Sequence, residues 1–182
     1  PSWVDDYVVS LGAVIPDIIS DTQYTVGPNG IYKKISDAWK VIAETDSTEF
    51  VIRVEEGTYS ESEMRGMPNK KIMIIGTGAG KTIITRDARP GPVIDFTQEK
   101  RYGYLFRSPK NVADSLIADN FELVCENMSF EYIGSIKNNW NGGLVICEVQ
   151  NQKYTFRNCN FKNIYSRQGS LVLSNPASDT PF

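Results

Sequence analysis

The fold is decided by Phe50-Val-Ile-Arg-Val-Glu-Glu-Gly-Thr-Tyr59 and, after a polar stretch, by Lys71-Ile-Met-Ile-Ile-Gly-Thr-Gly-Ala-Gly-Lys-Thr-Ile-Ile-Thr85. These stretches contain three short runs of apolar and β-branched residues, at Phe50–Val54, Ile72–Ile75 and Thr82–Thr85, and each run ends in a turn or in polar residues. The chain between the first two runs is long enough for a crossover but has no helical pattern. Parallel strands joined without a crossover helix indicate a coil of a parallel β-helix rather than a βαβ unit.

A repeat supports stacked coils further along the chain. Glu126-Asn-Met-Ser-Phe-Glu-Tyr-Ile133 superimposes on Arg157-Asn-Cys-Asn-Phe-Lys-Asn-Ile164 when the sequence is shifted by 31 positions. Fixed-period similarity of β-rich runs is typical of solenoids, because one coil alone cannot bury its apolar face. We therefore expect the aligned asparagines to form a ladder at a coil corner, and Phe130 to stack on Phe161 inside the helix.

The N-terminal region is predicted to hold an arm and a capping helix. Residues 1–22 contain short apolar runs broken by acidic residues and by Pro16, which indicates an extended arm that contacts the first coil or a neighbouring subunit. Residues 35–44 carry apolar side chains at the spacing of an amphipathic helix. Since the open end of a solenoid must be covered, we expect this helix to cap a β-helix domain spanning residues 23–182.

Four motifs follow one another in this part of the chain. They are Tyr24-Thr-Val-Gly-Pro-Asn-Gly30, Tyr32-Lys-Lys-Ile-Ser-Asp-Ala-Trp39, Val51-Ile-Arg-Val-Glu-Glu-Gly-Thr-Tyr-Ser-Glu61 and the run from Ile72 to Thr85. In this order they resemble the opening coils of pectin methylesterases and, more broadly, the pectin-lyase-like right-handed β-helix proteins, which include phage tailspikes. The resemblance implies an all-β, right-handed parallel β-helix (solenoid) with an N-terminal arm and a capping α-helix, the first part of a longer solenoid.

The resemblance also implies where an esterase would carry its catalytic groups, and the sequence departs from the family there. Pectin methylesterases use two aspartates, glutamines at an oxyanion site and an arginine, carried on successive coils. Gly142-Gly-Leu-Val-Ile146 has glycine in place of the first glutamine, and Gln168 is displaced by two residues from the second. Asp95-Phe96 occurs too early to stand for the family's acid/base aspartate. We therefore expect no catalytic residue in this chain.

Composition excludes several classes of protein. The chain has 182 residues, of which 19 are basic and 22 acidic, for a net charge of −3, and it has no histidine. This balance argues against nucleic-acid binding, and no stretch approaches the roughly 20 apolar residues of a membrane span. Without histidine, Ser-His-Asp and Cys-His catalysis are excluded.

No metal or cofactor is expected. Cys125, Cys147 and Cys159 lack the paired spacing of a zinc site, which leaves two alternatives open, three buried thiols or one disulfide with a free thiol. The glycine-rich run Gly76-Thr-Gly-Ala-Gly-Lys-Thr82 has Ile75 where a phosphate loop requires glycine, and a β run follows it where that loop requires a helix.

Two segments contain candidate residues for contact with a glycan. Trp140 lies between Asn139 and Asn141, and Tyr102 and Tyr104 lie in an alternating run. Aromatic rings can stack on sugar rings while neighbouring amides bind the hydroxyl groups. The alternative is that these rings simply pack against the wall of the solenoid.

The sequence thus favours a non-catalytic β-helix module of a surface or virion appendage, such as a tail fibre or tailspike, which serves attachment and recognition of a surface polysaccharide. The arm would anchor the module to protein neighbours, within a homotrimer, and the location would be extracellular, on a cell surface or on a virion. The alternative is the N-terminal part of a pectinesterase-like carbohydrate esterase or polysaccharide depolymerase whose catalytic coils lie beyond residue 182. A second alternative is a purely structural β-solenoid.

Overall fold

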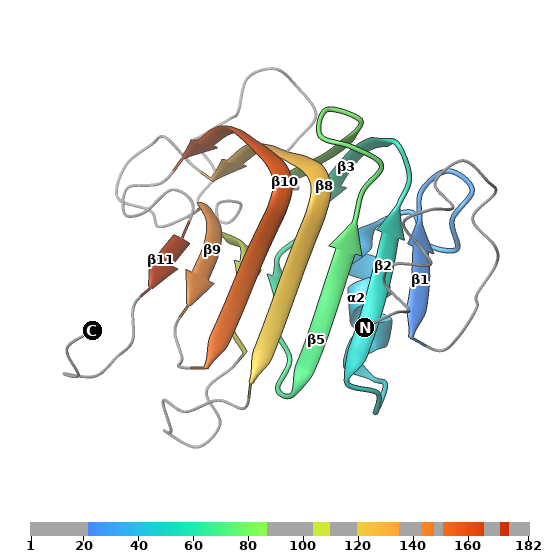
Figure 1. The fold of residues 1–182 in the computed structure, drawn as a ribbon, viewed down its shortest axis with the longest axis vertical. Coiled ribbons are helices and arrows are strands. Elements are labelled where there is room, and N and C mark those ends of the chain that lie inside the picture. Colours follow the sequence, from blue (N-terminus) through green and yellow to red (C-terminus); the bar gives the residue numbers. More distant parts are fainter. Residues whose placement is uncertain are drawn as a thin grey trace.

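The computed structural model describes residues 22–86, 104–109, 120–134, 143–147, 151–165 and 172–174. Within these residues the chain is mostly β-strand, with one α-helix (Figure 1). The predicted arm, residues 1–22, lies outside the described residues except for Thr22. No helix in the described ranges is long and apolar enough to cross a membrane.

The elements follow one another from β1 to β11, with α2 between the first two strands. They are β1 (Gln23–Val26), α2 (Ile35–Ala43), β2 (Glu49–Val54), β3 (Gly57–Glu61), β4 (Met64–Arg65), β5 (Lys70–Ile75), β6 (Thr82–Arg86), β7 (Tyr104–Arg107), β8 (Phe121–Gly134), β9 (Gly143–Cys147), β10 (Gln152–Tyr165) and β11 (Val172–Ser174).

The strands pair in parallel and form two sheets. The larger sheet has the order β1-β2-β5-β8-β6-β3, with β10 beside β8, and the smaller has the order β11-β9-β7-β4. Strand β8 is long enough to bend, so its first half pairs with β5 and its second half pairs with β6. The chain therefore runs through β2-β3-β4, returns through β5-β6, and returns again through β8 and β10, each time beside the previous turn.

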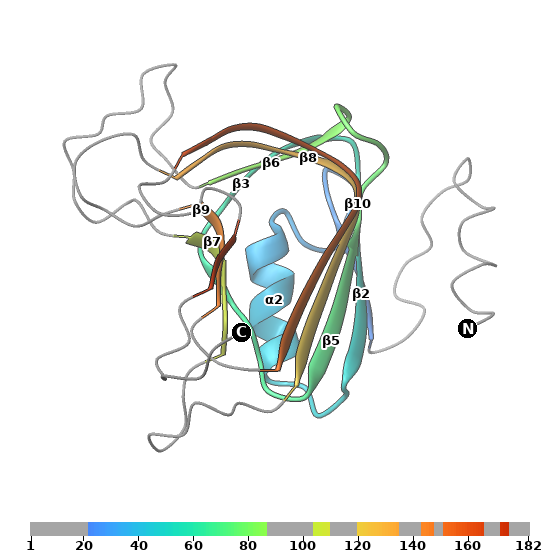
Figure 2. The ribbon, with the colours of Figure 1, turned by 60° about the vertical axis from the view of Figure 1, so that its left-hand side comes forward.

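The larger sheet curls into a half-barrel, with the smaller sheet facing part of it (Figure 2). The connection from β2 to β5 is described throughout and contains no helix. The prediction that the runs Phe50–Val54 and Ile72–Ile75 form parallel strands without a crossover helix is therefore confirmed for β2 and β5, whereas the connection from β1 to its parallel neighbour β2 contains α2. A complete right-handed β-helix stays a prediction.

Helix α2 lies inside the curl (Figure 2). It was predicted at residues 35–44, and the observed bounds differ from that prediction by one residue. Trp39 reaches from the helix to the core, with its ring 6.3 Å from that of Phe106 and 6.2 Å from that of Phe121. Its indole Nε1 donates a hydrogen bond to the Arg65 carbonyl oxygen at 2.7 Å. The helix is thus joined to both sheets through one side chain.

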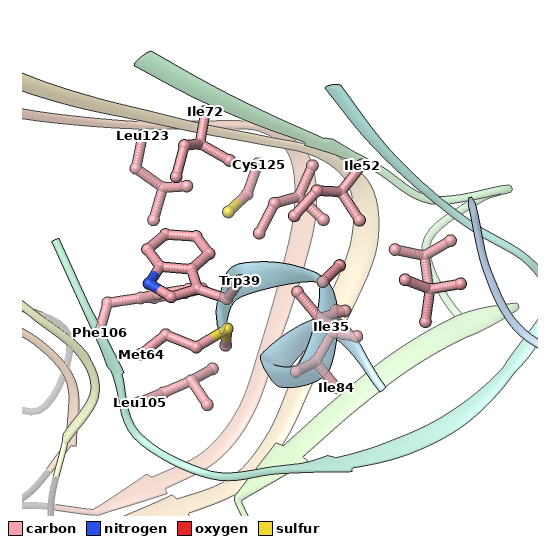
Figure 3. Close-up of a cluster of buried hydrophobic side chains, with 14 of the residues drawn as sticks. Ile35, Trp39, Ile52, Met64, Ile72, Ile84, Leu105, Phe106, Leu123 and Cys125 are labelled. Carbon is pink, nitrogen blue, oxygen red and sulfur yellow. The ribbon is translucent and has the colours of Figure 1, made fainter. Parts of the chain in front are cut away.

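Alternating residues of the larger sheet build the core. In register across β2, β5, β8 and β10 stand Ile52, Ile74, Cys125 and Phe156. The first three are buried, whereas Phe156 on the edge strand is partly exposed. Figure 3 shows Ile72, Leu123 and Cys125 beside Trp39, with Ile52 on the same side of the sheet, facing α2. Burial therefore decreases from the interior strands to β10.

A row of alternating charge crosses the opposite face of the same sheet. Glu49, Lys71, Glu122 and Lys153 are aligned in register on β2, β5, β8 and β10. The Lys71–Glu49 and Lys153–Glu122 pairs measure 3.8 and 2.8 Å. Such exposed pairs stabilise a protein by only about 0–1 kcal/mol. A like charge placed directly opposite would be destabilising, so the row favours the observed register.

Asparagines mark the corners between flat segments of the long strands. Asn127 and Asn158 have φ values of 57° and 48°, and Asn158 Nδ2 donates a hydrogen bond to Asn127 Oδ1 at 2.7 Å. Asparagine tolerates this left-handed region better than most residues. Phe130 and Phe161 stack with ring centres 5.7 Å apart and planes inclined by 10°. Both the predicted asparagine ladder and the predicted aromatic stack are confirmed.

Candidate functional site

One predicted glycan-contact residue lies in the described part of the chain. Tyr104 begins β7, opposite Gly143 of β9, and only 4% of its surface is exposed. Its ring is therefore buried in the wall rather than presented to a ligand. Tyr102, Asn139, Trp140 and Asn141 lie outside the described residues, so their contact with a glycan stays a prediction.

A cluster of three charged side chains lies beside β4 and β7, and we call it the arginine cluster. Glu63 Oε1 lies 3.8 Å from Arg65 Nη2 and 3.9 Å from Arg107 Nη1. The two arginines are paired in register, and each side chain is about one-third exposed. Planar guanidinium groups bind carboxylates through two parallel hydrogen bonds. This cluster therefore has the chemistry to bind an acidic ligand.

The arginine cluster was not recognised from the sequence. Arg65 and Arg107 are far apart in the chain, and neither belongs to a recognisable motif. Only the parallel pairing of β4 with β7 brings them together. Their register could not be read from the sequence, because the short strand β4 carries too little pattern to align.

A buried carboxylate holds the segment that precedes the arginine cluster. Glu61 is fully buried at the end of β3, two residues before Glu63. Its Oε1 and Oε2 accept hydrogen bonds from the backbone N–H groups of Ile35 and Ser36, both at 2.8 Å. Glu61 therefore caps the first turn of α2 and is not available as an acid or base towards a substrate.

The three cysteines are free thiols. Burial raises the pKa of the Cys125 thiol well above its ordinary value, and it raises the pKa of Cys147 to about 11. Burial also raises the pKa of Cys159. Because the thiolate is the reactive form, these groups are poor nucleophiles near neutral pH. The alternative of a disulfide with one free thiol is therefore wrong, and the alternative of three buried thiols holds fully only for Cys125, since Cys147 and Cys159 are partly exposed.

The alkylation rate of Cys147 is expected to depend steeply on pH. With a pKa of about 11, its thiolate fraction should rise about tenfold per pH unit between pH 7 and 10, because the thiol is far from fully ionised there. Iodoacetamide labelling followed by peptide mass spectrometry measures the rate. As a control, a cysteine introduced by Lys153→Cys at an exposed position should level off near the ordinary thiol pKa of about 8.5. Levelling of the Cys147 rate by pH 9 would contradict the assignment.

The sequence of the segment that contains α2 and the first parallel turns is similar to known proteins. Residues 23–98 match the Pectinesterase family model. The chain is 26% identical over 165 residues to the probable pectinesterase/pectinesterase inhibitor 21 of Arabidopsis thaliana, covering 88% of this chain and 22% of that protein. It is 37% identical over 88 residues to the probable pectinesterase/pectinesterase inhibitor 61 of the same plant, covering 47% of this chain and 15% of that protein. The predicted resemblance to pectinesterases is confirmed.

The match is to a part of each relative. A third relative, pectinesterase/pectinesterase inhibitor U1 of Solanum lycopersicum, is 33% identical over 90 residues, which is 47% of this chain and 14% of that protein. The chain thus spans about a fifth or less of the length of these relatives. No solved structure matches it. The matches favour the carbohydrate-esterase alternative, and none of them supports a tail fibre or another virion appendage.

Proposed function

We propose that the chain forms the opening turns of a pectinesterase-like right-handed β-helix that acts outside the cell on a pectin-type, uronic-acid-containing polysaccharide. The observation that carries the proposal is the overlap between the family match at residues 23–98 and the parallel turns from β1 to β6. These turns position the polysaccharide, and the catalytic coils lie beyond residue 182.

The edge strand β10 supports further turns of the same kind. Among the described strands β10 pairs with β8 and with no other. Its Phe161 stacks on Phe130 on one side yet remains 38% exposed. The row of alternating charge ends on this edge with Lys153. A further strand with an apolar residue beside Phe161 and an acidic residue beside Lys153 would continue both the core and the charged row.

The arginine cluster supports an acidic polysaccharide as ligand. Arg65 and Arg107 both lie within ion-pair distance of Glu63 Oε1, and guanidinium groups of this kind can bind the carboxylates of uronic acids through paired hydrogen bonds. A carbohydrate esterase also needs contacts away from its reacting centre to orient a long chain. In this proposal the cluster, together with Tyr102 and the segment 139–141, binds the polysaccharide, and other coils carry out the chemistry.

The test uses the native protein that carries this sequence. We would measure methanol release from methyl-esterified pectin and binding to unesterified polygalacturonate. Light scattering on the same sample gives the oligomeric state. We expect methanol release, binding to both polymers and a reduced affinity for the acidic polymer in Arg65→Ala. A native protein that neither releases methanol nor binds either polymer would overturn the proposal. A trimer with affinity for another surface polysaccharide would instead favour the appendage, the protein neighbours and the homotrimer that the sequence suggested.

A further inference from the structure

Tyr132 adopts a backbone conformation that is unusual for its residue type. It has a φ of 55° within β8, in the left-handed region. Five other non-glycine residues of the described chain have a positive φ, and all five are asparagines. A bulky side chain in this region is strained, because its Cβ approaches the following carbonyl oxygen. The corner at Tyr132 is therefore less stable with tyrosine than it would be with asparagine.

The next turn shows the ordinary residue for this corner. On β10 the position opposite Tyr132 is Asn163, because its neighbours Lys162 and Ile164 pair with Glu131 and Ile133. Asn163 has nearly the same φ, 54°, as Tyr132. The same bend is thus built by asparagine on one turn and by tyrosine on the turn before it. The bend itself does not require an aromatic residue.

About half of the surface of Tyr132 is exposed to solvent. Its exposed fraction is 48%, compared with 43% for Ile31 and 38% for Val41 and Phe161. Residues held in a strained backbone conformation are concentrated at functional sites. The structure therefore offers a physical reason to look for a ligand of this ring.

The surroundings of Tyr132 suit a sugar. The Glu131 and Lys162 side chains form an ion pair at 3.8 Å beside it, and Asn163 lies on the adjacent strand. An exposed aromatic face flanked by amide and charged groups can stack on a sugar ring, bind its hydroxyl groups and, through the lysine, attract a carboxylate.

We propose that Tyr132 is a stacking residue for an acidic polysaccharide, with Asn163 and the Glu131–Lys162 pair contacting the polar groups of the same sugar. The choice of ligand class rests on the proposed function. The placement of the site rests on the strained backbone and the exposed ring. Strain retained for binding predicts that stability and affinity change in opposite directions when the tyrosine is replaced.

Two substitutions in the native protein separate binding from folding. Tyr132→Asn installs the residue used at this corner on the next turn, so the melting temperature is expected to rise, while the affinity for oligogalacturonate falls about tenfold because the ring is lost. Tyr132→Phe keeps the ring and is expected to leave the affinity within about threefold of wild type. Calorimetry measures both quantities. Ile31→Asn, which changes another exposed apolar side chain in the turn after β1, should leave the affinity unchanged.

Each other outcome overturns the inference in a recognisable way. If the wild-type protein binds oligogalacturonate and Tyr132→Asn binds it equally well, the stacking role is wrong and the proposed function stands. If Tyr132→Asn lowers the melting temperature, the ring has a structural role and the site is wrong. If the wild-type protein binds neither pectin nor oligogalacturonate, the ligand class fails and both proposals fall together.

Discussion

Replacement of Glu61 by alanine is expected to lower the free energy of unfolding by about 3–5 kcal/mol, because it leaves two buried N–H groups without an acceptor. Both carboxylate oxygens of Glu61 accept a hydrogen bond at 2.8 Å, from Ile35 and from Ser36. These donors are themselves buried. The N-cap residue Lys34 makes no side-chain capping hydrogen bond. Glu61 therefore accepts the hydrogen bonds that a side chain at the N-cap accepts in most helices.

Graded substitutions distinguish the hydrogen bonds from general damage to the fold. Glu61→Gln keeps the volume and one acceptor, so its loss should be smaller, about 1–2 kcal/mol. Glu49→Ala removes an exposed carboxylate that pairs with Lys71 and should cost less than about 0.5 kcal/mol. Urea unfolding followed by circular dichroism measures all three variants. Equal losses for Glu61→Ala and Glu49→Ala would show that the capping contact contributes nothing.

Replacement of Phe130 by alanine is expected to cost about 3–5 kcal/mol, because it opens a cavity in the core that the surrounding structure fills only partly. The Phe130 ring stacks on Phe161 and makes edge contacts with Phe106 and Phe156. It is fully buried. Phe130 on β8 contacts rings on β7 and on β10. Its removal should therefore weaken the packing between successive turns, in addition to the packing of β8 itself.

Phe161→Ala is the matched control, because it removes the same ring from the next turn. Phe161 is 38% exposed, so its replacement should cost about 1–2 kcal/mol if β10 is an edge strand in the native protein, and about as much as Phe130→Ala if the proposed further turns cover it. Thermal unfolding of both variants, made in the native protein, compares the stability cost of Phe161→Ala with that of Phe130→Ala. A cost for Phe161→Ala equal to that for Phe130→Ala would show that another layer covers β10, as the proposed further turns require. A loss below about 1 kcal/mol for Phe130→Ala would contradict the assignment of this ring to the core.

The periodic features of the fold could be predicted from the sequence. Runs such as Phe50–Val54 and Ile72–Ile75 have the composition of buried strands, and the apolar spacing after residue 35 has the period of a helix. The repeat placed Asn127 opposite Asn158 and Phe130 opposite Phe161, and both pairings are observed. These predictions succeeded because stacked turns impose similar environments on equivalent residues, and similar environments select similar side chains.

The candidate site was less accessible from the sequence. Tyr104 was a candidate because it lies in an alternating aromatic run, yet the structure buries this residue. Alternation shows which residues share a face of a strand, but it does not show whether that face is exposed to solvent. The sequence analysis did not identify Tyr132. The 31-residue repeat aligns it with Asn163, and this difference was the signal that could have found it, whereas its strained φ and its exposure appear only in the structure. The function first favoured from the sequence, a virion appendage, has no support among the similar proteins, whereas the esterase alternative does.

By itself the sequence determined the strand-forming runs, the helix and the repeat, because each depends on the spacing of side chains along a few neighbouring residues. Three features follow only from the tertiary structure: Glu61 caps α2, Arg65 pairs in register with Arg107, and about half of Tyr132 is exposed. Each of these depends on which turn lies beside which, and on the direction of a side chain after the chain has bent. Such relations are set by packing over the whole half-barrel, and no local pattern encodes them.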